Sequence, residues 1–179
     1  MLFRSELHAA GGVHGTLSLD ALRREPPPPG GPERSGPVRL LQFPLAGDPH
    51  VEPLRPAADD EGFARLGRRA AYVAPELAAG QAVCDELSDV YAIGAILHAL
   101  LAGEPPHGDA GGLTAVRAAA RVGPPQLPDA VPRPLRDVAA RLLSTDRSLR
   151  LPSAREAAGA IAAAVGLDRK STRLNSSHA

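Results

Sequence analysis

The chain has 179 residues, enough to bury one sizeable hydrophobic core, so a single domain is expected. Its 20 basic and 20 acidic residues balance, which leaves no electrostatic footprint for nucleic acid or an anionic membrane surface. The 18 glycines and 19 prolines predict long loops around a compact part, and two tyrosines and three phenylalanines leave a core of Leu, Val, Ile and Ala.

Two features predict a cytoplasmic chain. The single cysteine, Cys84, cannot form an internal disulfide and is typical of a reducing compartment. Residues 1–12 lack the apolar segment of a signal peptide, and the longest apolar run, residues 90–103, is too short to span a bilayer. We therefore expect no membrane segment in this chain, while a membrane anchor of the parent protein beyond residue 167 stays open.

The first 69 residues predict little regular structure. Residues 1–24 resemble the end of a helix, a Gly-Gly break and a loop. The Pro/Gly-rich stretch EPPPPGGPERSGP, residues 25–37, predicts an irregular insertion between two short strands, because proline lacks a backbone donor. Residues 38–46 have strand-like composition, and residues 48–69 show no periodicity and predict a loop.

Residues 70–167 predict a helical bundle. The stretch CDELSDVYAIGAILHALLAG is apolar on nearly every face, which indicates a central buried helix. Gly103 and Pro105 follow in the order typical of a helix end. The expected core positions of this helix are Val90, Ile93, Ile96, Leu97, Leu100 and Leu101.

Three more helices are expected after residue 113. Residues 114–122 are Ala-rich, and a second helix starts near Pro134 and directs Leu135, Val138 and Leu142 to one face. In the third, Ser153 and Glu156 have the spacing of a capping box, and Ile161 and Val165 form the expected apolar edge.

The C-terminal segment differs in composition from the rest of the chain. Residues 168–178, DRKSTRLNSSH, are the in-frame translation of a common sequencing-library adapter. Residues 168–179 are therefore interpreted as an adapter-derived artefact tail, which also contains the only lysine, Lys170. The native chain is expected to continue differently beyond residue 167.

Three segments in the helical part carry a family resemblance: AAYVAPELAAG, SDVYAIGAILHALLAGEPP and LLSTDRSLRLPSA. In order and separation, over residues 69–166, they resemble the C-terminal lobe (C-lobe) of bacterial serine/threonine protein kinases. The resemblance implies a mainly α fold, a kinase-like C-lobe bundle with a short β-hairpin region and a Pro-rich insertion. The N-terminal lobe (N-lobe) of a kinase is absent from this chain.

The resemblance also implies structural roles for three charged residues. Glu76 would form a buried ion pair with Arg150, and Asp89 would accept hydrogen bonds from the backbone of the catalytic loop. The alternative is that all three are ordinary solvated surface charges.

The catalytic loop of the family corresponds to VHGTLSLDAL, residues 13–22. His14 matches the start of that loop, but Thr16 stands at the position of the catalytic Asp and Ala21 at that of the metal-binding Asn. A threonine hydroxyl is no base near neutral pH, and an alanine side chain offers no ligand at all. The loop is therefore degenerate.

The metal-binding segment, LLQFPLA, is degenerate as well. Gln42 replaces the metal-binding Asp, while Phe43 is kept. A neutral amide is a poor substitute for a carboxylate on a hard divalent cation. No G-x-G-x-x-G loop precedes His14, and no strand lysine exists. No catalytic, cofactor-binding or metal-binding site is intact, so we expect neither the ATP nor the Mg²⁺ that active relatives use.

Other polar residues suggest less. His98, on the buried helix, is interpreted as a core histidine, and His107 stands where the family often has an aromatic residue. Cys84 is interpreted as an inert thiol. Ser18 and Ser88 show no His-Asp partners that would support a hydrolase.

The first hypothesis for function is therefore a catalytically inactive, pseudokinase-type C-lobe that acts as a signalling or regulatory binding module. Its partners would be proteins, such as an active kinase or another signalling protein, and the Ala-Arg-Pro-Gly bias indicates a GC-rich bacterial genome. The alternative is a truncated fragment of a serine/threonine kinase, with ATP-dependent phosphoryl transfer to protein Ser/Thr, whose N-lobe is missing here. A helical adaptor unrelated to kinases is the third.

Overall fold

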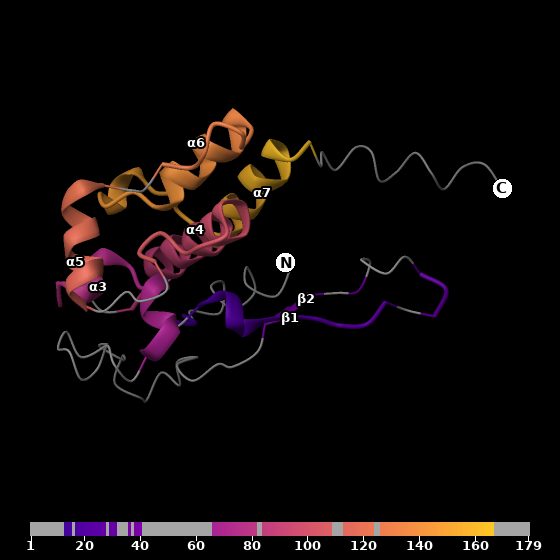
Figure 1. Cartoon of the computed structure of the whole chain (residues 1–179), viewed down its shortest axis with the longest axis horizontal. Coiled ribbons are helices and arrows are strands. Elements are labelled where there is room, and N and C mark those ends of the chain that lie inside the picture. The colour runs from indigo at the N-terminus through magenta and orange to yellow at the C-terminus, as the bar shows by residue number, and fades with distance from the viewer. Residues whose placement is uncertain are drawn as a thin grey trace.

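The computed structural model describes residues 13–15, 17–27, 29–31, 36, 38–40, 66–81, 84–108, 113–123 and 126–166. This part is mainly helical with a small antiparallel sheet, as expected (Figure 1). The elements in chain order are η1 Leu19–Ala21, β1 Leu22–Arg24, β2 Val38–Leu40, η2 Gly67–Tyr72, α3 Pro75–Ala78, α4 Glu86–Ala102, α5 Leu113–Val122, α6 Arg133–Leu142, η3 Arg147–Leu149 and α7 Ala154–Ala164.

Helix α4 is the centre of the bundle. It begins with a capping box in which Ser88 N donates to Asp85 Oδ1 at 3.0 Å and Asp85 N donates to Ser88 Oγ at 2.8 Å. It ends at Gly103, whose φ of 86° lies in the left-handed region that glycine tolerates. The prediction of a buried helix is confirmed except at Leu100, which is 64 % exposed.

The other helices pack on two sides of α4 (Figure 1). α6 and α7 cover one side, where Leu135, Ala139 and Leu142 meet Val90 and Ile93. Gly94 allows the closest approach, because a Cβ there would lie 2.6 Å from the Cβ of Leu142.

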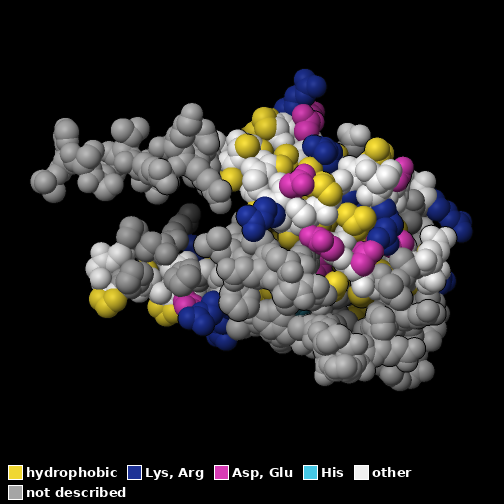
Figure 2. Space-filling view, turned by 180° about the vertical axis from the view of Figure 1, so that it is seen from behind, with side chains coloured by type: hydrophobic (Ala, Val, Ile, Leu, Met, Phe, Trp, Pro, Cys, Tyr) yellow, Lys and Arg dark blue, Asp and Glu magenta, His cyan; other side chains and the backbone are white. Residues whose placement is uncertain are grey.

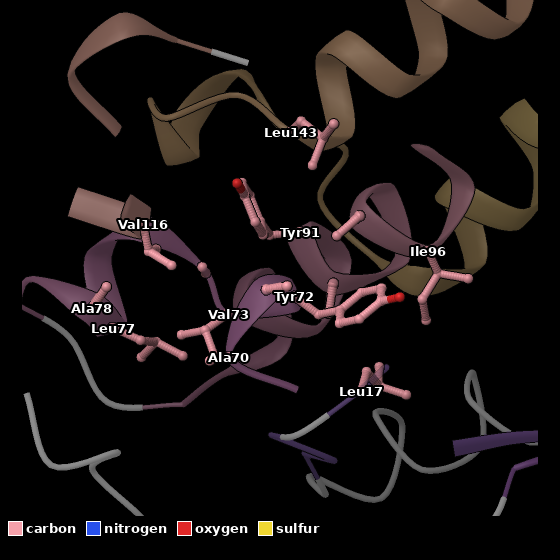
Figure 3. Close-up of a cluster of buried hydrophobic side chains, with 14 of the residues drawn as sticks. Leu17, Ala70, Tyr72, Val73, Leu77, Ala78, Tyr91, Ile96, Val116 and Leu143 are labelled. Carbon is pink, nitrogen blue, oxygen red and sulfur yellow. The ribbon is translucent and has the colours of Figure 1, made fainter. Parts of the chain in front are cut away.

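The second core cluster joins α4 to η2, α3 and α5 (Figure 3). Tyr91, Tyr72 and Leu77 lie in it together with Val116 of α5 and Leu17 of the degenerate loop. The loop is thus packed against the helical bundle.

α6 and α7 differ from expectation in detail. Pro134 lies in the first turn of α6, as predicted, and Ser153 Oγ accepts from Glu156 N at 3.1 Å at the start of α7. The expected apolar edge of α7 is wrong at Val165, which is 46 % exposed. The small side chains of Ala154 and Ala157 are buried instead, since they let α7 approach its neighbours closely.

β1 and β2 form a short antiparallel ribbon on either side of the Pro/Gly-rich insertion, with Leu22 opposite Leu40 and Arg24 opposite Val38. In Figure 1 the ribbon extends away from the helices. Within the predicted loop of residues 48–69, the helix η2 begins at Gly67. No helix in the described ranges is both long and apolar enough to cross a membrane.

Candidate functional site

The degenerate loop is attached to α4 by one carboxylate. Asp89, in the first turn of α4, is buried, and its Oδ2 accepts from His14 N at 2.8 Å while its Oδ1 accepts from Gly15 N at 2.9 Å. Gly15 itself has a φ of 77°, in the left-handed region that glycine tolerates. The contact that the resemblance implied for Asp89 is therefore present.

One of the three positions at which the resemblance places catalytic groups lies within the described residues. Ala21 is buried, so its methyl group lies in the core. Thr16, Gln42 and Phe43 fall outside the described residues. Among the residues that are described, no group of three or more His, Cys, Asp or Glu side chains could hold a metal ion.

Cys84 packs beside this loop. Its thiol lies 3.8 Å from the carbonyl oxygen of Gly15. Burial raises the pKa of the thiol to about 12, and the carboxylates of Asp89, Asp85 and Glu76 add to the rise. A neutral thiol is a poor nucleophile, in line with its interpretation as inert.

Glu76 and Arg150 form a buried, two-pronged ion pair. Nη1 of Arg150 donates to Oε1 of Glu76 and Nη2 to Oε2, both at 2.7 Å. Arg150 also donates to the carbonyl oxygens of Ser144, through Nε at 2.8 Å, and Leu87, through Nη1 at 3.0 Å. The pair implied by the resemblance is present, and it ties α3 to the segment before α7.

A second arginine extends this ion pair, and sequence reasoning missed it. Arg147 lies 3.7 Å from Glu76 and hydrogen-bonds Asp85, the N-cap of α4. Burial by itself raises the pKa of Asp85, but the hydrogen bonds from Arg147 and Ser88 outweigh it and hold the pKa below its ordinary value. The spacing Asp85-x-x-Ser88 signals the N-terminal cap of α4, but it gives no sign of the contact with Arg147.

A small pocket lies where the loop, η2, α3 and α4 meet. Its lining is mostly apolar and includes the charged residues Asp89 and Arg69. The lining residues are Gly15, Leu17, Leu66, Arg69, Tyr72, Val73, Ala74, Leu77, Ser88, Asp89 and Ala92. The space in the pocket is about 10 Å³, which is room for no more than about one water molecule.

The surface around the helices mixes both charge signs. On the face in Figure 2, acidic and basic side chains alternate with apolar ones over the described helices. This pattern agrees with the balanced net charge of the chain.

No protein-family model matches the chain, and no curated protein matches its sequence.

Proposed function

We propose that this chain is a pseudokinase-type C-lobe that acts by binding other signalling proteins and does not transfer phosphate. The observation that carries the proposal is the double contact of Asp89 with the amides of His14 and Gly15. A loop in which Thr16 and Ala21 take the catalytic positions is still held against α4, so the loop has kept its scaffold without its chemistry.

The Glu76–Arg150 ion pair supports the same proposal. The resemblance implied this pair for residues 74 positions apart, and solvated surface charges would not be buried in a two-pronged contact. The alternative of three ordinary surface charges is therefore disfavoured.

Three positions of the sequence lack the groups that phosphoryl transfer needs. A phosphoryl transferase needs a carboxylate to orient the substrate hydroxyl and metal ligands to neutralise the phosphates. Thr16, Ala21 and Gln42 supply none of these groups.

The proposed binding surface surrounds the pocket beside Asp89. Leu66 is partly exposed beside it and provides apolar contact area, and α5 flanks α3, where Arg117 Nε donates to the carbonyl oxygen of Ala78 at 3.0 Å. A short apolar segment of a partner kinase would lie across the partly exposed surface around Leu66 and would not enter the pocket.

Calorimetric titration tests the proposal, with the full chain added to active serine/threonine kinase domains encoded in the same genome. We expect binding that Leu66→Arg weakens at least tenfold, because a charge replaces a partly exposed apolar side chain of the proposed surface. Arg133→Ala, at an exposed position of α6, serves as the control and should leave the affinity unchanged. Equal affinity of Leu66→Arg and the unchanged chain would contradict the proposed surface.

A fragment of an active kinase is the other candidate function, and a radiolabelled ATP assay separates the two. The binding module produces no phosphorylated protein by itself or when mixed with a kinase N-lobe. Transfer that depends on the added N-lobe would favour the fragment.

A further inference from the structure

His107 occupies an unusual place for an ionisable residue. It lies in the turn after α4, where its Nε2 is 2.8 Å from the hydroxyl oxygen of Tyr91, a residue near the start of that helix. The two rings are nearly parallel, with an angle of 11° between their planes and 6.2 Å between their centroids. The turn is thereby fastened along α4.

Tyr91 connects His107 to the buried ion pair. The guanidinium carbon of Arg150 lies 4.9 Å from the centroid of the Tyr91 ring, a cation–π contact. Arg150 in turn binds Glu76. The Tyr91 ring is buried beside Leu143 in the cluster shown in Figure 3.

The surroundings of His107 suit only the neutral ring. Its Nδ1 is buried and has no hydrogen-bond partner among the described residues, so a proton added there would find no acceptor. Burial, followed by the effect of His98, lowers the pKa of His107 to about 4.

None of the charged and titratable groups identified around the ring would stabilise a positive charge on His107. His98 and Tyr91 come from α4, Arg150 from the segment before α7, and Glu76, from α3, is already bound to Arg150. His98 Nδ1 lies 2.9 Å from the carbonyl oxygen of Glu104, and since a carbonyl only accepts, His98 carries its proton there.

We propose that His107 is an acid-sensitive latch, which holds residues 103–108 against α4 while its ring is neutral and releases them when the ring is protonated. Leu113 and Val116 of α5 share the core cluster of Tyr91 with Leu77 of α3, so release of the turn loosens α5 from α3. The latch depends on these contacts alone and stands independently of the proposed function.

The test follows the histidine ring nitrogens and the backbone amides of the full chain by NMR between pH 7.5 and 4. If the released ring has the ordinary pKa of 6.5, linkage predicts that the opening equilibrium of residues 103–108 rises about 20-fold from pH 7 to pH 5. Amide exchange in the turn and in α5, corrected for its intrinsic pH dependence, should rise by the same factor.

Two variants separate the latch from general acid damage. His107→Phe keeps an aromatic ring that cannot be protonated. In this variant, amide exchange in the turn and in α5 should rise less than twofold between pH 7 and pH 5. Tyr91→Phe removes only the hydroxyl that lies against Nε2 of His107, and it should increase the opening of residues 103–108 already at pH 7. A His107 that titrates near 6.5 in the unchanged chain, or a full rise in exchange that persists in His107→Phe, would overturn the proposal.

Discussion

Arg150 donates a hydrogen bond from each of its two terminal nitrogens to the carboxylate of Glu76, both at 2.7 Å, although the two residues are 74 positions apart in the sequence. The guanidinium also donates to two backbone carbonyls, so each of its three nitrogens has a protein acceptor. Glu76 is only 7 % exposed, and the side chain of Arg150 is completely buried. A desolvated pair in which every guanidinium nitrogen donates a hydrogen bond resists disruption strongly, because either partner alone is left as a buried charge.

Removing one member of this pair should therefore be costly. We expect Glu76→Gln to lower the free energy of unfolding by about 3 to 5 kcal/mol, measured by urea denaturation. Glu156→Gln is the control, since that side chain is exposed and its backbone amide makes the cap. A loss below about 1 kcal/mol for Glu76→Gln would mean that the pair is solvated in solution.

A charge reversal at both positions is a poor test of the same pair. Glutamate at position 150 cannot donate to the carbonyl oxygens of Ser144 and Leu87, so the swap should not restore stability even if the pair exists. A double-mutant cycle with Glu76→Gln and Arg150→Met isolates the pairing term, which should be about 1 to 3 kcal/mol.

Asp89 should hold the degenerate loop through two hydrogen bonds. In Asp89→Asn only one side-chain oxygen remains, and the amide NH₂ group faces a backbone N–H donor. We therefore expect the free energy of unfolding to fall by about 2 to 3 kcal/mol. Hydrogen exchange at the amides of His14 and Gly15 should accelerate selectively. Asp129→Asn, at a side chain 97 % exposed, should change neither quantity. Unaltered exchange at both amides in Asp89→Asn would contradict the contact.

Gly94 and Gly159 should respond in opposite directions to the same substitution. Both lie inside helices, where alanine is intrinsically better by about 1 kcal/mol. At Gly94, however, the new Cβ would lie 2.6 Å from the Cβ of Leu142. Gly94→Ala should therefore lower the free energy of unfolding by about 1 to 3 kcal/mol, because α6 is displaced. A Cβ at Gly159 would have no atom within 4 Å, so Gly159→Ala should raise the free energy of unfolding by up to about 1 kcal/mol. A gain in both variants would show that α4 and α6 are not in close contact.

The thiol of Cys84 should be nearly unreactive in the folded chain. A pKa raised from 9.0 to about 12 lowers its thiolate fraction at pH 8 about a thousandfold, so alkylation by iodoacetamide should be much slower than in urea. The free energy of unfolding should also fall as the pH rises above about 9. In that range the thiol ionises in the unfolded chain but stays neutral in the folded one, which favours the unfolded state. Equal alkylation rates in native and unfolded chains would be the contrary outcome.

The sequence was most informative where chemistry and pattern agree over many residues. An all-round apolar stretch ending at Gly103 indicated that α4 is buried, and the structure confirms it. The exposure of Leu100 and Val165 was not predictable, since periodicity shows which side chains are apolar but not whether a neighbouring element covers them.

The candidate site divides in the same way. Glu76, Asp89 and Arg150 were identified through the resemblance, and their contacts are present in the structure. The contacts of Arg147 with Asp85 and of His107 with Tyr91 were missed, because they join residues that no local spacing links. Only the packing of η3 and of the turn after α4 against the bundle brings them together.

The central claim, a kinase-type loop without its catalysts, is tested most directly by long-read sequencing of the genomic locus across the codons for residues 16, 21 and 42. The account predicts that Thr16, Ala21 and Gln42 are encoded in the genome as they stand here. Codons for Asp at positions 16 and 42 and for Asn at position 21, in frame with an upstream Gly-rich loop and strand lysine, would contradict it and indicate an active kinase.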